Sequence, residues 1–127
     1  MVGPIFGQAF GANVFGLQII FVIPNRCVTK MHVCVCKLRL QLPGTSSLKG
    51  KRQIVQSLIS RIRNKFNVSI AEVEELDSWQ NTVLAVSCVS NSKRHGEEVI
   101  AKVISYIEGT RGDVLITDID RETLSGF

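Results

Sequence analysis

The chain has 127 residues, of which 45% are hydrophobic and 20% are charged, and its formal net charge is +4. This length suits a single domain, and the apolar fraction excludes a disordered chain or a low-complexity repeat. The four cysteines are too few for the disulfide framework of a small secreted protein. We therefore expect reduced thiols and a cytoplasmic location.

The first thirty residues differ in character from the rest of the chain. Residues 1–23 contain no charged side chain, and their longest apolar run, residues 17–23, is interrupted by Gln18 and too short to span a bilayer. A signal peptide requires positive charge before its apolar run, and no positive charge precedes this one. We interpret residues 1–30 as an N-terminal extension, either disordered or created by a translation start assigned too early. Residues 31–127 then form a single domain, with no membrane partner expected.

From Met31 onward, the apolar pattern predicts alternating strands and helices. Residues 32–42 alternate with period two, which is typical of a half-buried strand. Residues 45–47 offer N-caps to an amphipathic helix that ends at Asn67. Residues 68–74 and 79–89 predict two strands joined by a hairpin.

The remaining residues complete the pattern. Residues 90–92 cap a second amphipathic helix, which Gly109 and Gly112 close. Residues 114–120 predict the last strand, followed by a short tail. The order βαββαβ predicts an α+β, ferredoxin-like split βαβ fold. In this fold a four-stranded antiparallel sheet of order 4-1-3-2 carries two helices on one face.

Several blocks of the chain resemble a known family. They are residues 47–52 (SLKGKR), 65–73 (KFNVSIAEV), 77–80 (DSWQ), 89–91 (VSN) and 94–99 (RHGEEV). In this order, and over about residues 31–124, the chain resembles the YlxP-like family of small, functionally uncharacterised bacterial proteins.

The resemblance implies a ferredoxin-like fold and a bacterial cytoplasmic protein. Genes of the family commonly lie beside those for translation initiation and ribosome maturation factors, and the family supplies no catalytic residue. Two glycines depart from the family pattern. Gly50 stands where the family usually has a charged residue, and Gly96 stands where it usually has an apolar one. We expect both glycines to loosen the first turn of a helix.

Charge is distributed unevenly along the chain. Residues 26–65 contain ten of the fifteen Lys and Arg residues and no acidic residue, whereas all eleven acidic residues lie in residues 66–127. In the predicted fold, the first helix ends where the second begins, so two basic groups are expected side by side. These groups are Arg61, Arg63 and Lys65, and Lys93, Arg94 and His95. A helix start also offers free N–H groups that suit a phosphate.

These charges predict a nucleic-acid-binding surface with RNA or a ribosomal particle as partner, through salt-sensitive phosphate contacts. Its candidate residues are Lys49, Lys51, Arg52, Arg61, Arg63, Lys65, Lys93 and Arg94. The alternative is a solvated basic face whose charges pair with the acids of the second half. The chain lacks the RNP1 pattern of an RRM, and Trp79 is interpreted as a hairpin packing residue rather than a stacking platform.

A nucleotide-binding loop and a zinc site are weaker interpretations. Residues 44–51 lie between a strand and a helix, but five residues rather than four separate Gly44 from Gly50, and Arg52 replaces the Ser or Thr of a P-loop. A zinc ion would need convergent ligands, yet cysteines on a buried strand face more often behave as apolar residues. The zinc candidates are His32, Cys34, Cys36 and Cys88.

Paired carboxylates are a third weak signal. Asp118, Asp120 and Glu122 are spaced to share one strand face, as Glu72 and Glu74 are. Such pairs can bind magnesium or perform acid–base chemistry, but charges on edge strands more often prevent edge pairing. We therefore expect no catalytic residue, no metal and no cofactor.

The function predicted from the sequence is a non-enzymatic RNA- or ribosome-associated factor in translation or ribosome maturation. The alternative is a self-associating protein-interaction module, such as a homodimer, with no nucleic-acid role. Val33 and Val35 support this alternative, since they place an apolar patch on the outward face of the sheet. A metal-dependent enzyme is the third and weakest possibility.

Overall fold

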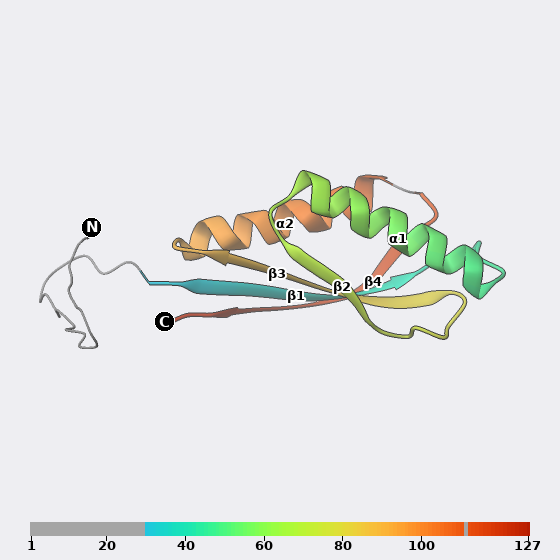
Figure 1. Ribbon diagram of the computed structural model, residues 1–127, viewed down its shortest axis with the longest axis horizontal. Helices are drawn as coiled ribbons and strands as arrows, with labels where there is room; N and C mark the ends of the chain where they lie inside the picture. The colour runs from blue at the N-terminus through green and yellow to red at the C-terminus, as the bar shows by residue number, and fades with distance from the viewer. Residues whose placement is uncertain (1–29, 111) are drawn as a thin grey trace, which may run out of the picture.

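The computed structural model describes residues 30–110 and 112–127. Its elements are β1 (His32–Gln41), α1 (Leu48–Lys65), β2 (Ser69–Glu74), β3 (Asn81–Ser90), α2 (Lys93–Thr110) and β4 (Leu115–Leu124). The strands form one antiparallel sheet of order β2-β3-β1-β4, and both helices cover the same face (Figure 1). The predicted α+β, ferredoxin-like fold and its strand order are confirmed. The extension predicted for residues 1–30 lies outside the described residues, apart from Lys30.

The core lies between the sheet and the helices. The alternation of β1 places one set of side chains inward, where they are at most 2% exposed. Each helix adds an apolar stripe at the spacing of an amphipathic helix. The buried apolar side chains of these three elements are Cys34, Cys36, Leu38, Leu40, Val55, Leu58, Ile59, Ile62, Ile100, Val103, Ile104 and Ile107.

Both helices begin at the predicted serine caps. The Gly50 N–H donates to Ser47 Oγ at 3.0 Å, and the His95 N–H donates to Ser92 Oγ at 3.2 Å, so each serine satisfies a free amide of the first turn. α2 continues to Thr110. Gly109 therefore lies within the last turn of α2, and the prediction that it closes the helix is wrong.

The last strand is longer than predicted. β4 ends at Leu124, because its last residues pair with the beginning of β1, Arg121 opposite Cys36 and Leu124 opposite Val33. An edge strand needs pairing on one side only, so polar residues continue it without an apolar alternation. β3, in contrast, begins at Asn81 rather than Trp79, since the preceding residues form a turn.

The two helices are staggered along the sheet, so the predicted meeting of the end of α1 with the start of α2 is wrong (Figure 1). β2 begins at Ser69, which pairs with Ser87, whereas β3 continues to Ser90 before the chain enters α2. Because α1 leads directly into β2, α1 ends at a level of the sheet that β3 has not yet left. The Nζ atom of Lys65 lies 5.6 Å from the centre of the Tyr106 ring. Tyr106 lies about 20 Å along α2 from its first residue, at 1.5 Å per residue.

α2 approaches the sheet closely at Gly96. A Cβ atom at this position would lie 2.6 Å from Cys34 Sγ on β1. Whatever it costs the helix, Gly96 has a packing role that the sequence did not show, because the absent side chain is what lets α2 pack against β1. Neither helix in residues 30–110 and 112–127 has the length and apolar character needed to cross a membrane.

Candidate nucleic-acid interface

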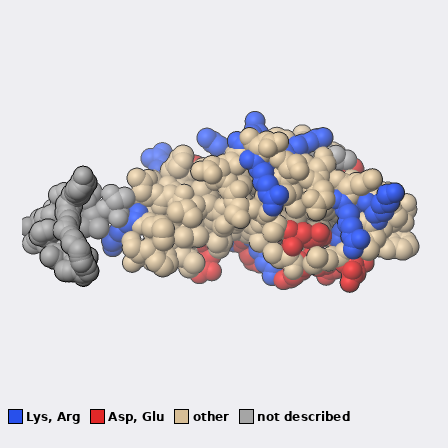
Figure 2. Space-filling model, viewed as in Figure 1, with Lys and Arg blue, Asp and Glu red and all other residues tan. Residues whose placement is uncertain are grey.

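α1 presents a surface whose charged side chains are all basic. Five of its Lys and Arg residues are exposed, and the helix contains no acidic residue. We call these residues the α1 basic face: Lys49, Arg52, Arg61, Arg63 and Lys65. Figure 2 shows Lys and Arg side chains mostly over the helices at the top, with Asp and Glu mostly along the sheet below. The charge asymmetry of the sequence thus becomes an asymmetry between two faces.

The cations of the α1 basic face are not neutralised by neighbours. None of the salt bridges within residues 30–110 and 112–127 involves them. Arg63 donates to the carbonyl oxygen of Ile70 at 3.0 Å, which ties one guanidinium nitrogen to β2. Lys65 lies over the rings of Phe66 and Tyr106, which leaves its charge at the surface. These groups can therefore accept an external anion without first breaking an ion pair.

Lys51 does not belong to this surface, although the sequence made it a candidate. Its side chain is 0% exposed and its ammonium group donates to Glu72 Oε2 at 2.9 Å. The same Nζ atom reaches the carbonyl oxygens of Glu75 at 2.7 Å, Asn81 at 3.3 Å and Leu76 at 3.4 Å. Burial of a cation is tolerated because these oxygens replace its water shell. Lys51 is thus a structural link between α1 and the β2–β3 turn.

The basic residues at the start of α2 form a separate group. Lys93 and Arg94 are exposed, but Arg94 Nε donates to Glu98 Oε2 at 3.3 Å. Because the helices are staggered, this group lies far along α2 from the place where Lys65 contacts it. The sequence predicted that the two basic groups at the end of α1 and the start of α2 lie side by side, and the structure keeps them apart. The two groups are Arg61, Arg63 and Lys65, and Lys93, Arg94 and His95.

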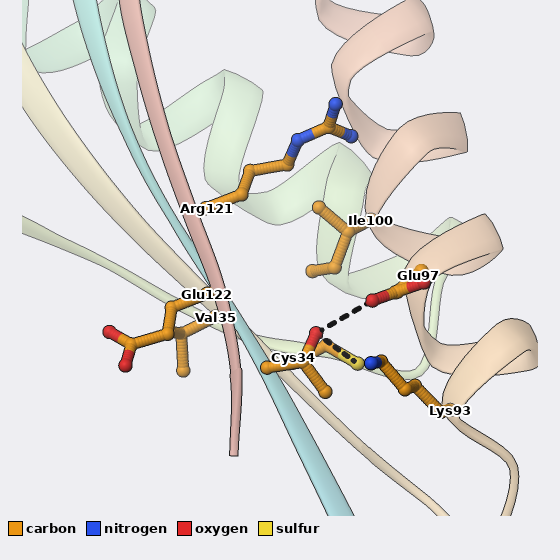
Figure 3. Close-up of a pocket in the computed structure, with 8 residues that line it drawn as sticks. Cys34, Val35, Lys93, Glu97, Ile100, Arg121 and Glu122 are labelled. Carbon is orange, nitrogen blue, oxygen red and sulfur yellow. Dashed lines mark hydrogen bonds between the residues drawn. The ribbon is translucent and has the colours of Figure 1, made fainter.

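A cleft of about 430 Å³ opens between α2 and β4 (Figure 3). Lys93, Glu97 and Ile100 line it from the helix, and Arg121 and Thr123 line it from the strand. The Thr123 hydroxyl lies 3.0 Å from Glu97 Oε2 and 3.7 Å from Cys34 Sγ. The Thr123 hydroxyl thus links the strand side of the cleft to Glu97 on α2.

The proposed zinc ligands do not converge. No group of three or more potential metal ligands occurs in residues 30–110 and 112–127. His32 Nδ1 lies 2.7 Å from Ser125 Oγ instead. Cys34, Cys36 and Cys88 are buried free thiols, and burial raises the pKa of Cys36 and Cys88 above the ordinary thiol value. These cysteines therefore behave as small core residues.

The carboxylates divide between the two faces of the sheet. Asp118, Asp120 and Glu122 lie on the face away from the helices, opposite Arg39, Lys37 and Val35 in β1.

Glu72 and Glu74 do not share a face, contrary to the prediction. A register shift between them turns Glu72 toward Lys51, while Glu74 pairs with Lys37 across the outer face. The hydrogen bond from Lys37 lowers the pKa of the Glu74 carboxyl below its ordinary value.

Trp79 is the residue that the sequence interpretation misplaced most clearly. It lies in the turn before β3 and is 57% exposed, so it does not pack under the hairpin. Leu76 in the same turn is 51% exposed. The signal for this lay in residues 75–78, which are polar except for Leu76 and thus typical of a surface turn.

Fold and surface together define a small ferredoxin-like α+β protein with one basic helical face. A family model described as "Protein of unknown function (DUF503)" matches residues 33–121, and the chain belongs to this family. It is also similar to the "Uncharacterized protein YlxP" of Bacillus subtilis (strain 168), with 39% identity over 62 residues, which is 49% of this chain and 67% of the relative. The resemblance to the YlxP-like family is thereby confirmed.

Proposed function

We propose that the protein is a non-enzymatic, cytoplasmic RNA- or ribosome-associated factor in translation or ribosome maturation. Its phosphate contacts come from the α1 basic face. The observation that carries the proposal is that this helix exposes five cations, contains no acid, and forms no salt bridge to a carboxylate of the described residues. A surface of one sign attracts a polyanion and releases its counterions on binding.

The extent of the binding surface follows from the positions of its residues. Arg52 and Arg61 lie about 14 Å apart along the axis of α1. This spacing requires an extended anion with several phosphates rather than a single one. Lys93 and Arg94 supply a second, weaker contact for a longer polymer, since Arg94 already pairs with Glu98. Lys51 is not part of the surface.

The thiols and the cleft support a non-enzymatic role. A catalytic cysteine needs a lowered pKa, whereas burial raises the pKa of Cys36 and Cys88. In the cleft between α2 and β4, Glu97 is held by the Thr123 hydroxyl. The buried free thiols also fit the reducing conditions of the cytoplasm.

The test is cosedimentation of the full chain with bacterial ribosomal particles across a salt series. The informative variant is Arg61→Gln/Lys65→Gln, because neither side chain makes a hydrogen bond or salt bridge within the described residues. The matched control is Lys37→Gln/Arg39→Gln, which removes the same charge from the sheet face. These ion pairs are close to half-exposed, so their loss has little effect on stability.

The proposal predicts binding that weakens steeply with salt, a clear loss in the α1 variant, and near wild-type binding in the control. Equal weakening in both variants would mean that only net charge matters. Absence of binding even at low salt would refute the proposal.

The second candidate function is self-association through the outer face of the sheet. Val33 lies directly between Val89 and Leu124 in the register of the three strands, and the latter two are 62% and 43% exposed. This row forms an apolar patch that a second copy can cover. Light scattering after size-exclusion chromatography distinguishes the candidates. A dimer that persists in high salt and dissociates in Val89→Glu supports self-association, whereas a monomer excludes it.

A further inference from the structure

The turn between β2 and β3 exposes two large apolar side chains. Leu76 and Trp79 are 51% and 57% exposed, although tryptophan is usually well buried in folded proteins. No aromatic ring contact of Trp79 occurs within residues 30–110 and 112–127. Neither face of its indole is therefore covered by another ring of the described residues.

The turn that carries Trp79 is held firmly. The Ser78 N–H donates to the Glu75 carbonyl oxygen at 3.1 Å, and Ser78 Oγ accepts from the Asn81 N–H at 3.1 Å. Beneath the turn, the buried Lys51 ammonium bonds the carbonyl oxygens of Glu75, Leu76 and Asn81. Burying a lysine is costly unless it is fully paired, so this turn is a strongly constrained part of the molecule. A backbone that is already ordered loses little conformational entropy when the turn binds a partner.

The same contacts place the turn at the end of the molecule where α1 begins (Figure 1). Gln80, the neighbour of Trp79, donates from Nε2 to the carbonyl oxygens of Pro43 and Thr45 at 3.4 Å, in the loop that leads into α1. Lys51 lies in the first turn of α1, between the exposed Lys49 and Arg52. The tryptophan and these two cations are thus presented at one end of the molecule by elements tied together.

We propose that Trp79 is a stacking platform for an unpaired base of single-stranded RNA, whose adjoining phosphates pair with Lys49 and Arg52. This inference rests on the proposed function and names the form of nucleic acid that the surface selects. Aromatic stacking tolerates any base, because each base has a π face, and it requires a base that is not already stacked in a duplex. Glu75 and Asp77 are also exposed in the turn, and their repulsion directs the phosphates toward α1.

The experiment uses the fluorescence of Trp79, which is the only tryptophan of the chain. The full-length protein is titrated with three probes: a single-stranded oligouridylate of roughly ten nucleotides, a duplex RNA of equal length, and inorganic polyphosphate, which carries charge but no base. Binding is measured independently by anisotropy of labelled RNA and by competition with polyphosphate. The variants are Trp79→Ala, Trp79→Phe and Lys49→Gln/Arg52→Gln.

We expect oligouridylate to quench the fluorescence, and duplex RNA and polyphosphate to leave it nearly unchanged. Trp79→Ala weakens oligouridylate binding about tenfold, Trp79→Phe restores most of it, and neither alters polyphosphate binding. Lys49→Gln/Arg52→Gln weakens the binding of both oligouridylate and polyphosphate. Because Trp79, Lys49 and Arg52 are exposed, each variant is expected to have the same midpoint of urea unfolding as the wild type.

Different failures have different meanings. If oligouridylate binds without quenching and Trp79→Ala binds it equally well, the stacking inference is wrong while the proposed function survives. If Trp79→Ala loses ribosomal particles but keeps oligouridylate, Trp79 contacts a protein and the inference is also overturned. If neither polymer nor ribosomal particles bind at low salt, the proposed function itself fails.

Discussion

The two helices have the same length and lie on the same face of the sheet, yet their surfaces differ. Both have 18 residues and an apolar stripe in the core. α2 mixes acidic and basic residues, some of which bond within the fold, with Arg94 bonded to Glu98 and Glu97 bonded to Thr123. The charged residues of α1 are all basic, and Lys51 is the buried one among them. α2 thus turns part of its charge toward the fold, whereas α1 combines one structural cation with five exposed cations that form no salt bridge within residues 30–110 and 112–127.

The largest expected effect concerns the structural cation of α1. Lys51→Met leaves the partly buried Glu72 carboxylate and three carbonyl oxygens without their donor. We expect the free energy of unfolding in urea to fall by about 3–5 kcal/mol. Lys49→Met, two residues away and exposed, is the control and is expected to change it by less than roughly 0.5 kcal/mol. Similar losses in both variants would show that Lys51 has no special role.

A second prediction concerns the anchoring of α2 at Gly96. Gly96→Ala forces the new Cβ atom against Cys34 Sγ, so we expect a loss of about 1–3 kcal/mol in the free energy of unfolding. In a Cys34→Ala background the obstructing sulfur is gone. There, Gly96→Ala is expected to stabilise by up to about 1 kcal/mol, because alanine favours the helix. The same sign in both backgrounds would contradict the account of this close approach.

A third prediction compares the helices directly in binding. Arg61→Gln/Lys65→Gln on α1 and Lys93→Gln/Arg94→Gln on α2 remove equal charge. We expect the α1 pair to weaken single-stranded RNA binding several-fold and the α2 pair to weaken it about half as much in logarithmic terms, since Arg94 is already paired. Anisotropy at one fixed salt concentration measures both. A larger effect of the α2 pair would place the main phosphate contacts on α2 and contradict the proposed role of α1.

The smallest expected effect lies on the opposite face of the sheet, at Glu74. The bond from Lys37 lowers the pKa of this carboxyl, so its contribution to stability is present above the ordinary carboxyl pKa and is lost as the pH falls through the lowered value. The stability difference between wild type and Glu74→Gln should therefore shrink below about pH 4. Urea unfolding at several pH values measures it. A difference that is independent of pH would contradict this assignment.

The sequence predicted the architecture well because apolar periodicity determines it. The alternation of β1, the two amphipathic stripes and the serine caps were sufficient to predict the element order, the strand order and the inward residues. The end of β4 was missed because an edge strand can consist of polar residues whose pairing partner is distant in sequence. The packing role of Gly96 was missed for a similar reason, since its contact with Cys34 is not local.

The candidate surface was predicted only in part. Which cations cluster depends on the stagger of the helices, which follows from the position of β2 along β3 and not from any local signal. Lys51 resembles its exposed neighbours in the run KGKR, and only the tertiary contacts with the β2–β3 turn distinguish it. The exposure of Trp79 depends on the same turn. Long-range contacts therefore decide which of the candidate residues lie on the proposed surface.

The most direct test of the central claim is the salt dependence of single-stranded RNA binding when the α1 basic face is neutralised. The wild-type chain is compared with Lys49→Gln/Arg52→Gln/Arg61→Gln/Lys65→Gln, which leaves Lys51 and Arg63 in place. Each phosphate contact contributes about 0.7 to the slope of log K against log salt for single strands. The account predicts a slope that is less steep by about 3 in a variant that remains folded. An unchanged slope would mean that the phosphates bind elsewhere on the molecule.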